Sequence, residues 1–194
     1  MKWTYQVNAL DKFETTPLVV DGVMYFTEPP NTIVAIDAKT GRPYWKYEHP
    51  VPETTYACCG NVNRGVAVSK GRVFVGTLDG RLIALDARSG KPIWTVSTVE
   101  GKRPYTVTGA PLIAGNRVIV NSHTFGLRCF EITAADGGLQ AREAWANPAL
   151  TINLATLVSV GPSLYGQGAK SDFICVDTAT GQLRWSKAGF GLGR

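Results

Sequence analysis

The stretch Ala35-Ile36-Asp37-Ala38-Lys39-Thr40-Gly41-Arg42-Pro43-Tyr44-Trp45 occurs in two further versions along this chain. Its pattern, Asp-x-x-Thr/Ser-Gly with a Trp four residues after the Gly, returns over 86–94 and 177–185. The Asp and the hydroxyl can accept hydrogen bonds from N–H groups of a turn, and Gly can adopt a positive φ. Such a stretch is typical of a tight connection between two antiparallel strands. Three copies with the same internal spacing predict a repeat architecture.

Short apolar runs between turn residues divide the chain into four similar units. Tryptophans recur at intervals of 40 to 51 residues, which is the size of a β-propeller blade. We therefore predict an all-β chain, a β-propeller of four-stranded antiparallel blades that forms one domain over residues 1–194. The blades are expected at about 13–49, 64–98, 109–147 and 154–188, after a lone strand over 2–7 from a preceding blade. Four blades and one strand would make a partial or incomplete ring.

Two local expectations accompany this pattern. The tryptophans, at positions 3, 45, 94, 145 and 185, are expected to pack between blades, with each ring N–H bound to a carbonyl. The third unit lacks the repeated turn sequence, and its last two strands are expected over 126–132 and 140–145.

Composition and charge exclude several classes of protein. A chain that is 44% hydrophobic and 10% aromatic is not expected to be disordered. The net charge of +5 comes from Lys and Arg residues scattered along the turns, so a solvated basic surface is favoured over a nucleic-acid interface. No apolar run reaches the ~20 residues of a membrane span. The first residues, Met1-Lys2-Trp3-Thr4-Tyr5-Gln6, show no signal peptide, which leaves a cytosolic protein or part of an exported one.

The four cysteines are too few for a disulfide scaffold. Cys129 and Cys175 lie within strand patterns and are interpreted as small buried hydrophobic residues. The adjacent Cys58 and Cys59 leave two interpretations open: two buried thiols, or a strained disulfide that offers a flat surface to a planar ligand. Arg64 is likewise either a surface residue paired with a carboxylate or a charged fork for an oxygen-rich ligand.

Three stretches resemble one known family. They are Tyr56-Ala57-Cys58-Cys59-Gly60-Asn61-Val62-Asn63-Arg64-Gly65, the segment Phe13–Tyr25 and Thr108-Gly109-Ala110-Pro111. Together with the flanking Trp motifs, they are similar to the pyrroloquinoline quinone (PQQ)-dependent, or quinoprotein, alcohol dehydrogenases over residues ~3–120. The resemblance implies an oxidoreductase that converts a primary alcohol to an aldehyde by hydride transfer to PQQ. It also implies a periplasmic location, a periplasmic electron acceptor and a Ca²⁺ ion beside the cofactor.

The resemblance also assigns residues to the cofactor. Cys58 and Cys59 would form a vicinal disulfide stacked on PQQ, and Arg64 would bind the quinone oxygens, with Glu14 and Thr108 at the polar rim. A fixed cation there would stabilise the negative charge that develops on the oxygens during hydride transfer.

After about residue 115 the sequence departs from that family. Where the family has a Glu that binds calcium, this chain has Asn121-Ser122-His123-Thr124-Phe125, and His123 is a poor ligand for an ion that prefers oxygen. No catalytic base and no metal ligand are assigned, so we expect a fragment or divergent member that is inactive or weak alone. The C-terminal part resembles generic PQQ-like propeller repeats. The alternative is therefore a non-catalytic propeller that serves as a protein-binding scaffold in the cell envelope, with possible self-association through open blade edges.

Overall fold

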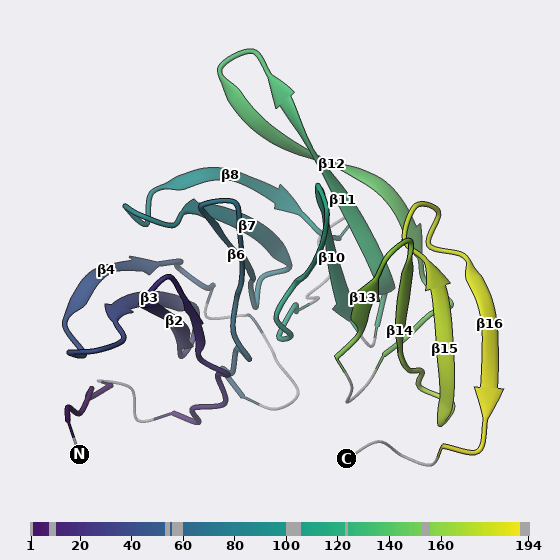
Figure 1. Ribbon diagram of the computed structural model, residues 1–194, viewed down its shortest axis with the longest axis horizontal. Helices are drawn as coiled ribbons and strands as arrows, with labels where there is room; N and C mark the ends of the chain where they lie inside the picture. Colours follow the sequence, from purple (N-terminus) through teal and green to yellow (C-terminus); the bar gives the residue numbers. More distant parts are fainter. Residues whose placement is uncertain are drawn as a thin grey trace. The chain divides into compact units, whose positions relative to one another are not determined.

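The computed structural model describes residues 2–7, 11–52, 55, 60–99, 106–122, 124–152 and 156–190. Within these ranges the structure contains sixteen β-strands and no helix. The strands form four antiparallel sheets of four strands each. The strands of each sheet follow one another in chain order, as Figure 1 shows. The prediction of an all-β chain built from four-stranded antiparallel blades is confirmed. The described part of the chain contains no helix long and apolar enough to cross a membrane.

The chain divides into two compact units, and Met1–Ala110 is the first. Its first sheet consists of β1 (Leu18–Val20), β2 (Val23–Glu28), β3 (Thr32–Asp37) and β4 (Pro43–Glu48). Its second sheet consists of β5 (Ala67–Ser69), β6 (Arg72–Gly76), β7 (Arg81–Asp86) and β8 (Pro92–Ser97). Apolar side chains of both sheets share one core, which includes Tyr25, Ile33, Val73 and Ile83.

The second unit, Pro111–Arg194, also contains two sheets. One has β9 (Leu112–Ala114), β10 (Arg117–Ser122), β11 (Gly126–Ala135) and β12 (Gly138–Asn147). The other has β13 (Val158–Val160), β14 (Ser163–Gln167), β15 (Asp172–Asp177) and β16 (Leu183–Ala188). Leu127, Leu164 and Ile174 lie in the core that these two sheets share. The prediction of a single domain over the whole chain stays a prediction.

The repeated turn has the hydrogen bonds that its sequence predicts. In the first copy, Oδ1 of Asp37 accepts hydrogen bonds from the backbone N–H groups of Lys39 and Thr40, at 2.8 and 2.7 Å. The Gly41 N–H donates to the Asp37 carbonyl at 2.8 Å, and Gly41 has a φ of 75°. The same Asp-to-Gly arrangement recurs in the other two copies of the turn. The turn is therefore encoded locally, which is why it recurs with one geometry.

The ring of a tryptophan packs directly against the glycine of each repeated turn. A Cβ atom placed on Gly41, Gly90 or Gly181 would lie 2.6, 2.6 or 2.3 Å from Trp3, Trp45 or Trp145, respectively, so no side chain fits there. Nε1 of Trp45 donates to the Ala87 carbonyl at 3.0 Å, and Nε1 of Trp145 donates to the Thr178 carbonyl at 3.1 Å. The predicted packing is thus found at these sites. For the buried Nε1 of Trp94, no partner is found among the described residues.

A small residue lies opposite the tryptophan of each blade. The pairs are Ala35 with Trp45, Ala84 with Trp94, Cys129 with Trp145 and Cys175 with Trp185. The register shifts directly after this pair in every blade, as expected for a bulge beside a large ring. Both cysteines are buried and free. They therefore fill the same place as alanine in the other blades, in agreement with their interpretation as small buried residues.

Two strand predictions need correction. The third sheet ends in a hairpin of two ten-residue strands, β11 and β12, instead of the shorter pair expected over 126–132 and 140–145. The turn consists of Asp136 and Gly137, and both Gly137 and the adjacent Gly138 have a positive φ. The two strands therefore remain paired as far as Ala135 and Gly138, next to the turn. Residues 2–7 form no strand, because no ladder partner is found for them within the described ranges.

Candidate functional site

Three polar residues occupy the same place in successive repeats. The first strands of the first three blades end at Val20, Ser69 and Ala114. Glu14, Asn63 and Thr108 each lie six residues before these ends. The backbone joins these segments: the Thr16 N–H donates to the Arg64 carbonyl at 3.1 Å, and the Arg64 N–H donates to the Thr108 carbonyl at 2.8 Å. The repeat thus brings together segments that are far apart in the sequence.

The side chain of Arg64 lies between Glu14 and Thr108, two of the other predicted site residues. Its Nη2 is 3.0 Å from Oε2 of Glu14, and its Nη1 donates to Oγ1 of Thr108 at 2.9 Å. The side chains of Arg64 and Glu14 are 44% and 37% exposed, so a ligand can reach them. The structure therefore brings together Glu14, Arg64 and Thr108.

A guanidinium held in this way can still bind a ligand. It carries five N–H donors in a planar fork, and the two contacts above use one group on each of Nη1 and Nη2. Because an exposed ion pair contributes little to folding, the pair with Glu14 acts chiefly to orient the fork. The arrangement suits an oxygen-rich, anionic and planar ligand.

Cys58 and Cys59 lie outside the described residues, as does His123. Among the residues that are described, no group of three or more His, Cys, Asp or Glu side chains could hold a metal ion.

Close backbone approach holds the segment of Arg64 in position. Gly65 has a φ of 127°, and a Cβ atom on it would lie 3.0 Å from the Thr16 carbonyl oxygen. A Cβ atom on Gly76 would lie 2.2 Å from Cγ1 of Val107, the neighbour of Thr108. Glycine is therefore required at both points.

Sequence reasoning missed the buried polar residues behind this site. Thr27 and Asn63 are 1% and 3% exposed, and Oγ1 of Thr27 donates to the Asn63 carbonyl at 2.8 Å. Thr27 is the polar residue that ends the apolar run of β2, a signal that could have singled it out. Its partner, Asn63, lies in a different blade, and nothing in the local sequence indicates that contact.

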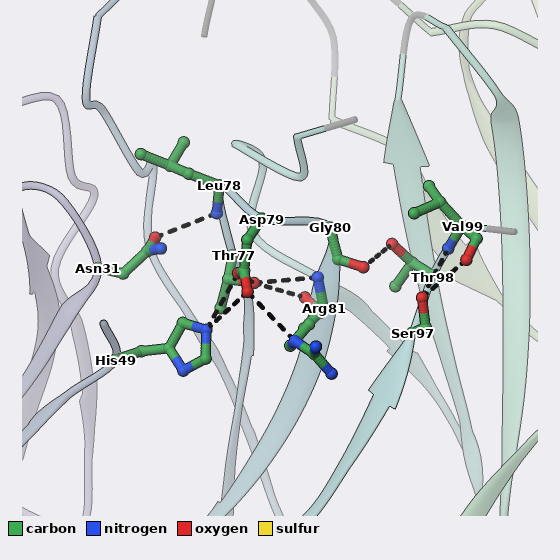
Figure 2. Close-up of polar contacts among 10 residues, drawn as sticks. All are labelled: Asn31, His49, Thr77, Leu78, Asp79, Gly80, Arg81, Ser97, Thr98 and Val99. Carbon is green, nitrogen blue, oxygen red and sulfur yellow. Dashed lines mark hydrogen bonds and ion pairs between the residues drawn. The ribbon is translucent and has the colours of Figure 1, made fainter. Parts of the chain in front are cut away.

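A second polar cluster, whose side chains Figure 2 shows, joins the first two blades. It also supports Thr108 through the backbone. Nε2 of His49, which follows β4, lies 3.0 and 3.1 Å from the two carboxylate oxygens of Asp79, between β6 and β7. Oγ1 of Thr77 donates to Oδ1 of Asp79, and the Thr77 carbonyl accepts a hydrogen bond from the Val107 N–H at 3.0 Å. The cluster therefore fixes the backbone directly before Thr108.

Burial by itself would raise the pKa of Asp79. Hydrogen bonds from His49 and Thr77 and the charge of His49 outweigh that effect and lower the pKa from 3.8 to about 2. Asp79 is therefore a carboxylate at neutral pH.

Comparisons with known proteins agree with this architecture. A family model described as outer membrane protein assembly factor BamB (PQQ_2) matches residues 1–187. The 1-butanol dehydrogenase (cytochrome c) of Thauera butanivorans is 46% identical over 69% of this chain and 20% of its own length. The quinohemoprotein alcohol dehydrogenase ADH-IIG of Pseudomonas putida is 44% identical over 75% of this chain and 21% of its own length.

A solved structure similar to this chain is a β-propeller. The solved structure of ADHIIG from Pseudomonas putida HK5 matches 95% of this chain and 35% of that protein, with 30% identity and a TM-score of 0.73. The predicted β-propeller class is therefore confirmed. The chain spans about a fifth of the length of the curated relatives named here.

Proposed function

Since this chain belongs to the PQQ_2 family and is, over more than two thirds of its length, 44–46% identical to two alcohol dehydrogenases, we propose that it forms part of a PQQ-dependent alcohol dehydrogenase. The proposed substrate is a primary alcohol, oxidised to an aldehyde in the periplasm, with electrons passed to a periplasmic acceptor. The Thauera relative is a 1-butanol dehydrogenase (cytochrome c), which supports an alcohol as substrate and a cytochrome as acceptor.

The observation that carries this proposal is the guanidinium of Arg64 held between Glu14 and Thr108. PQQ has carboxylates and two adjacent quinone oxygens on a planar ring system, which is the kind of ligand that such a fork can bind. When bound, it would supply a two-electron acceptor for the hydride of the alcohol. We assign the binding of its oxygens to Arg64 and of its polar rim to Glu14 and Thr108. Cys58 and Cys59 are proposed to form a vicinal disulfide against its ring face.

Arg64 has a second role in this proposal. A cation that is already in place stabilises negative charge as it develops on neighbouring oxygens, without the cost of reorganising solvent. Its two anchors keep it from turning away, since Glu14 and Thr108 hold separate nitrogens of the fork. The neighbouring carboxylate also keeps the local charge close to balanced before a ligand binds.

The catalytic base and the calcium ligands are not assigned to any residue of this chain. Loss of a general base typically lowers a rate 10²–10⁴-fold. We therefore propose that the chain alone binds the quinone and that its turnover is weak or absent.

Titration with the free cofactor tests this proposal. PQQ is added to the purified chain, with and without Ca²⁺, and binding is followed by the absorption of the quinone. We expect saturable binding that weakens about tenfold in Arg64→Lys, which keeps the charge and loses the fork. Arg72→Lys is the control, because Arg72 lies in β6, where its Nε donates to the Lys70 carbonyl at 3.3 Å. Absence of binding, or equal affinities of the two variants, would overturn the cofactor role.

A second candidate is a protein-binding scaffold of the cell envelope. It is favoured by the family match to an outer membrane assembly factor and by the outer edge of the last blade, where all six residues of β16 are exposed. Unpaired strand edges can add a strand from another chain, including a second copy of the same protein. Size-exclusion chromatography coupled to light scattering tests self-association, and a monomer at all concentrations would contradict it.

A further inference from the structure

Two hydroxyls, that of the buried Thr27 and that of the partly buried Thr15, connect the segments that carry Glu14 and Arg64. The O–H of Thr27 must be the donor in its contact with the Asn63 carbonyl at 2.8 Å, because a carbonyl only accepts. Thr27 has one hydroxyl proton, so in its 2.9 Å contact with Thr15 it is the Thr15 hydroxyl that donates. Oγ1 of Thr15 in turn accepts from the Thr27 N–H at 3.0 Å.

Asn63 extends this chain of contacts into the second blade. Its Nδ2 donates to the Gly76 carbonyl at 2.6 Å, and its Oδ1 accepts from the Gly65 N–H at 3.1 Å. Thr27 and Gly76 occupy equivalent places, since each pairs with the residue four before the turn Asp of its blade. Asn63, directly before Arg64, is therefore bonded to Thr27 of the first blade and to Gly76 of the second. Gly65, directly after Arg64, is bonded to the side chain of Asn63.

We propose that Thr27 and Asn63 are positioning residues for the ligand-binding pair Arg64 and Glu14. Thr27 contacts Thr15, the neighbour of Glu14, and Asn63, the neighbour of Arg64. One buried hydroxyl thereby sets the spacing between the two segments and the reach of the guanidinium toward the carboxylate. The inference rests on the proposed function in one respect only, namely that the ligand of this pair is a quinone.

The hydrogen bond between Thr27 and Asn63 can hold the segment of Arg64 in place because it is buried. Thr27 and Asn63 are almost fully enclosed, so water cannot replace a lost hydrogen bond between them. Arg64 and Glu14 are partly exposed and would otherwise exchange partners with solvent. Loss of the Thr27 hydroxyl should therefore loosen the segment of Arg64 more than it unfolds the blade.

Three threonine variants test the proposal. Thr27→Val keeps the shape and removes the hydroxyl, whereas Thr27→Ser keeps the hydroxyl. The matched control is Thr98→Val, because Thr98 is equally buried and its hydroxyl donates to the Gly80 carbonyl at 2.8 Å in the second blade. Thermal unfolding of all three variants establishes that the fold is retained.

The direct measurement is hydrogen exchange of two backbone amides by NMR. The N–H groups of Thr16 and Arg64 bind the Arg64 and Thr108 carbonyls. We expect both to exchange about fivefold or more faster in Thr27→Val, at wild-type rates in Thr98→Val, and close to wild-type rates in Thr27→Ser. Unchanged exchange in Thr27→Val, or an equal effect of Thr98→Val, would overturn the positioning role.

Quinone affinity gives the second measurement. We expect PQQ to bind about fivefold more weakly to Thr27→Val, with recovery in Thr27→Ser and no change in Thr98→Val. If the unmodified chain does not bind PQQ, the proposed cofactor is wrong, and the amide exchange still decides whether Thr27 positions Arg64. If exchange rises but affinity does not change, the link between the hydroxyl and the ligand is wrong.

Discussion

The imidazole of His49 faces the carboxylate of Asp79, with Nε2 3.0 Å from Oδ1, and this contact joins the first blade to the second. Both side chains are largely buried, at 13% and 15% exposure, and Oδ2 of Asp79 also accepts from Nε of Arg81 at 3.1 Å. Asp79 therefore concentrates the polar contacts of this junction.

We expect Asp79→Asn to destabilise the protein by about 1–3 kcal/mol at pH 7, because buried partners lose a charged acceptor. The pKa of Asp79 is lowered from 3.8 to about 2 in the folded protein, so its contribution is complete above about pH 4 and is lost as the pH falls toward 2. Urea unfolding of wild type and variant at pH 7 and pH 2.5 should show a smaller difference at the lower pH. A difference that does not change with pH would contradict this explanation.

Gly90→Ala is expected to destabilise the first unit by about 2–4 kcal/mol. The new Cβ would meet the ring of Trp45 at 2.6 Å, and the residue has a φ of 70°, so a steric cost adds to a backbone cost. Gly71→Ala separates the two contributions, because Gly71 has a φ of 71° and a Cβ added to it would have no neighbouring atom within 4 Å. It should cost only about 1–2 kcal/mol. Equal losses in chemical denaturation would show that the Trp45 contact is not tight.

The thiol of Cys129 should be inert in the folded protein. Burial raises its pKa to about 12, so almost no thiolate forms at pH 8. Because alanine fills the equivalent places in the first two blades, we expect Cys129→Ala and Cys175→Ala each to cost less than about 2 kcal/mol. Rapid labelling of wild-type Cys129 by a thiol reagent under native conditions would contradict the burial.

The double variant Cys129→Ala/Cys175→Ala then tests the proposed bridge between Cys58 and Cys59. After oxidative purification and unfolding without reductant, we expect no free thiol to be alkylated, and two after reduction, as read by mass spectrometry. Two alkylated thiols before reduction would rule out the vicinal disulfide.

Thr108→Val should weaken PQQ binding about fivefold with little effect on unfolding. It removes the hydroxyl that accepts from Nη1 of Arg64 and leaves the backbone bond between Arg64 and Thr108 in place. Thr108→Ser should restore the affinity, as measured by titration of the quinone absorption. Equal affinities of wild type and Thr108→Val would remove the hydroxyl from the site.

Local signals made the blades predictable from the sequence. Asp37 and Gly41 form their turn with hydrogen bonds inside a few residues, so the copies at Asp86 and Asp177 could be recognised without knowledge of the rest. The longer β11–β12 hairpin was not foreseen, because its extra residues alternate only weakly between apolar and polar.

The site was only partly predictable, for a related reason. Glu14, Arg64 and Thr108 were assigned from a resemblance, and the structure adds that their side chains meet. Thr27 was overlooked because threonine is common in strands, and its acceptor lies 36 positions away. Contacts of this kind depend on how two blades pack, which no short stretch of sequence records.

Glu14, Asn63 and Thr108 share one place in the repeat yet differ completely in chemistry: an acid, a buried amide and an alcohol. The turns and tryptophans that hold each blade together lie at other positions. Asn63 is buried and bonds both blades, whereas Glu14 and Thr108 contact the guanidinium of Arg64. Exchange of the side chain at Glu14 or Thr108 can therefore alter what the protein binds while the scaffold is kept, which makes these two positions the natural ones at which to redesign ligand preference.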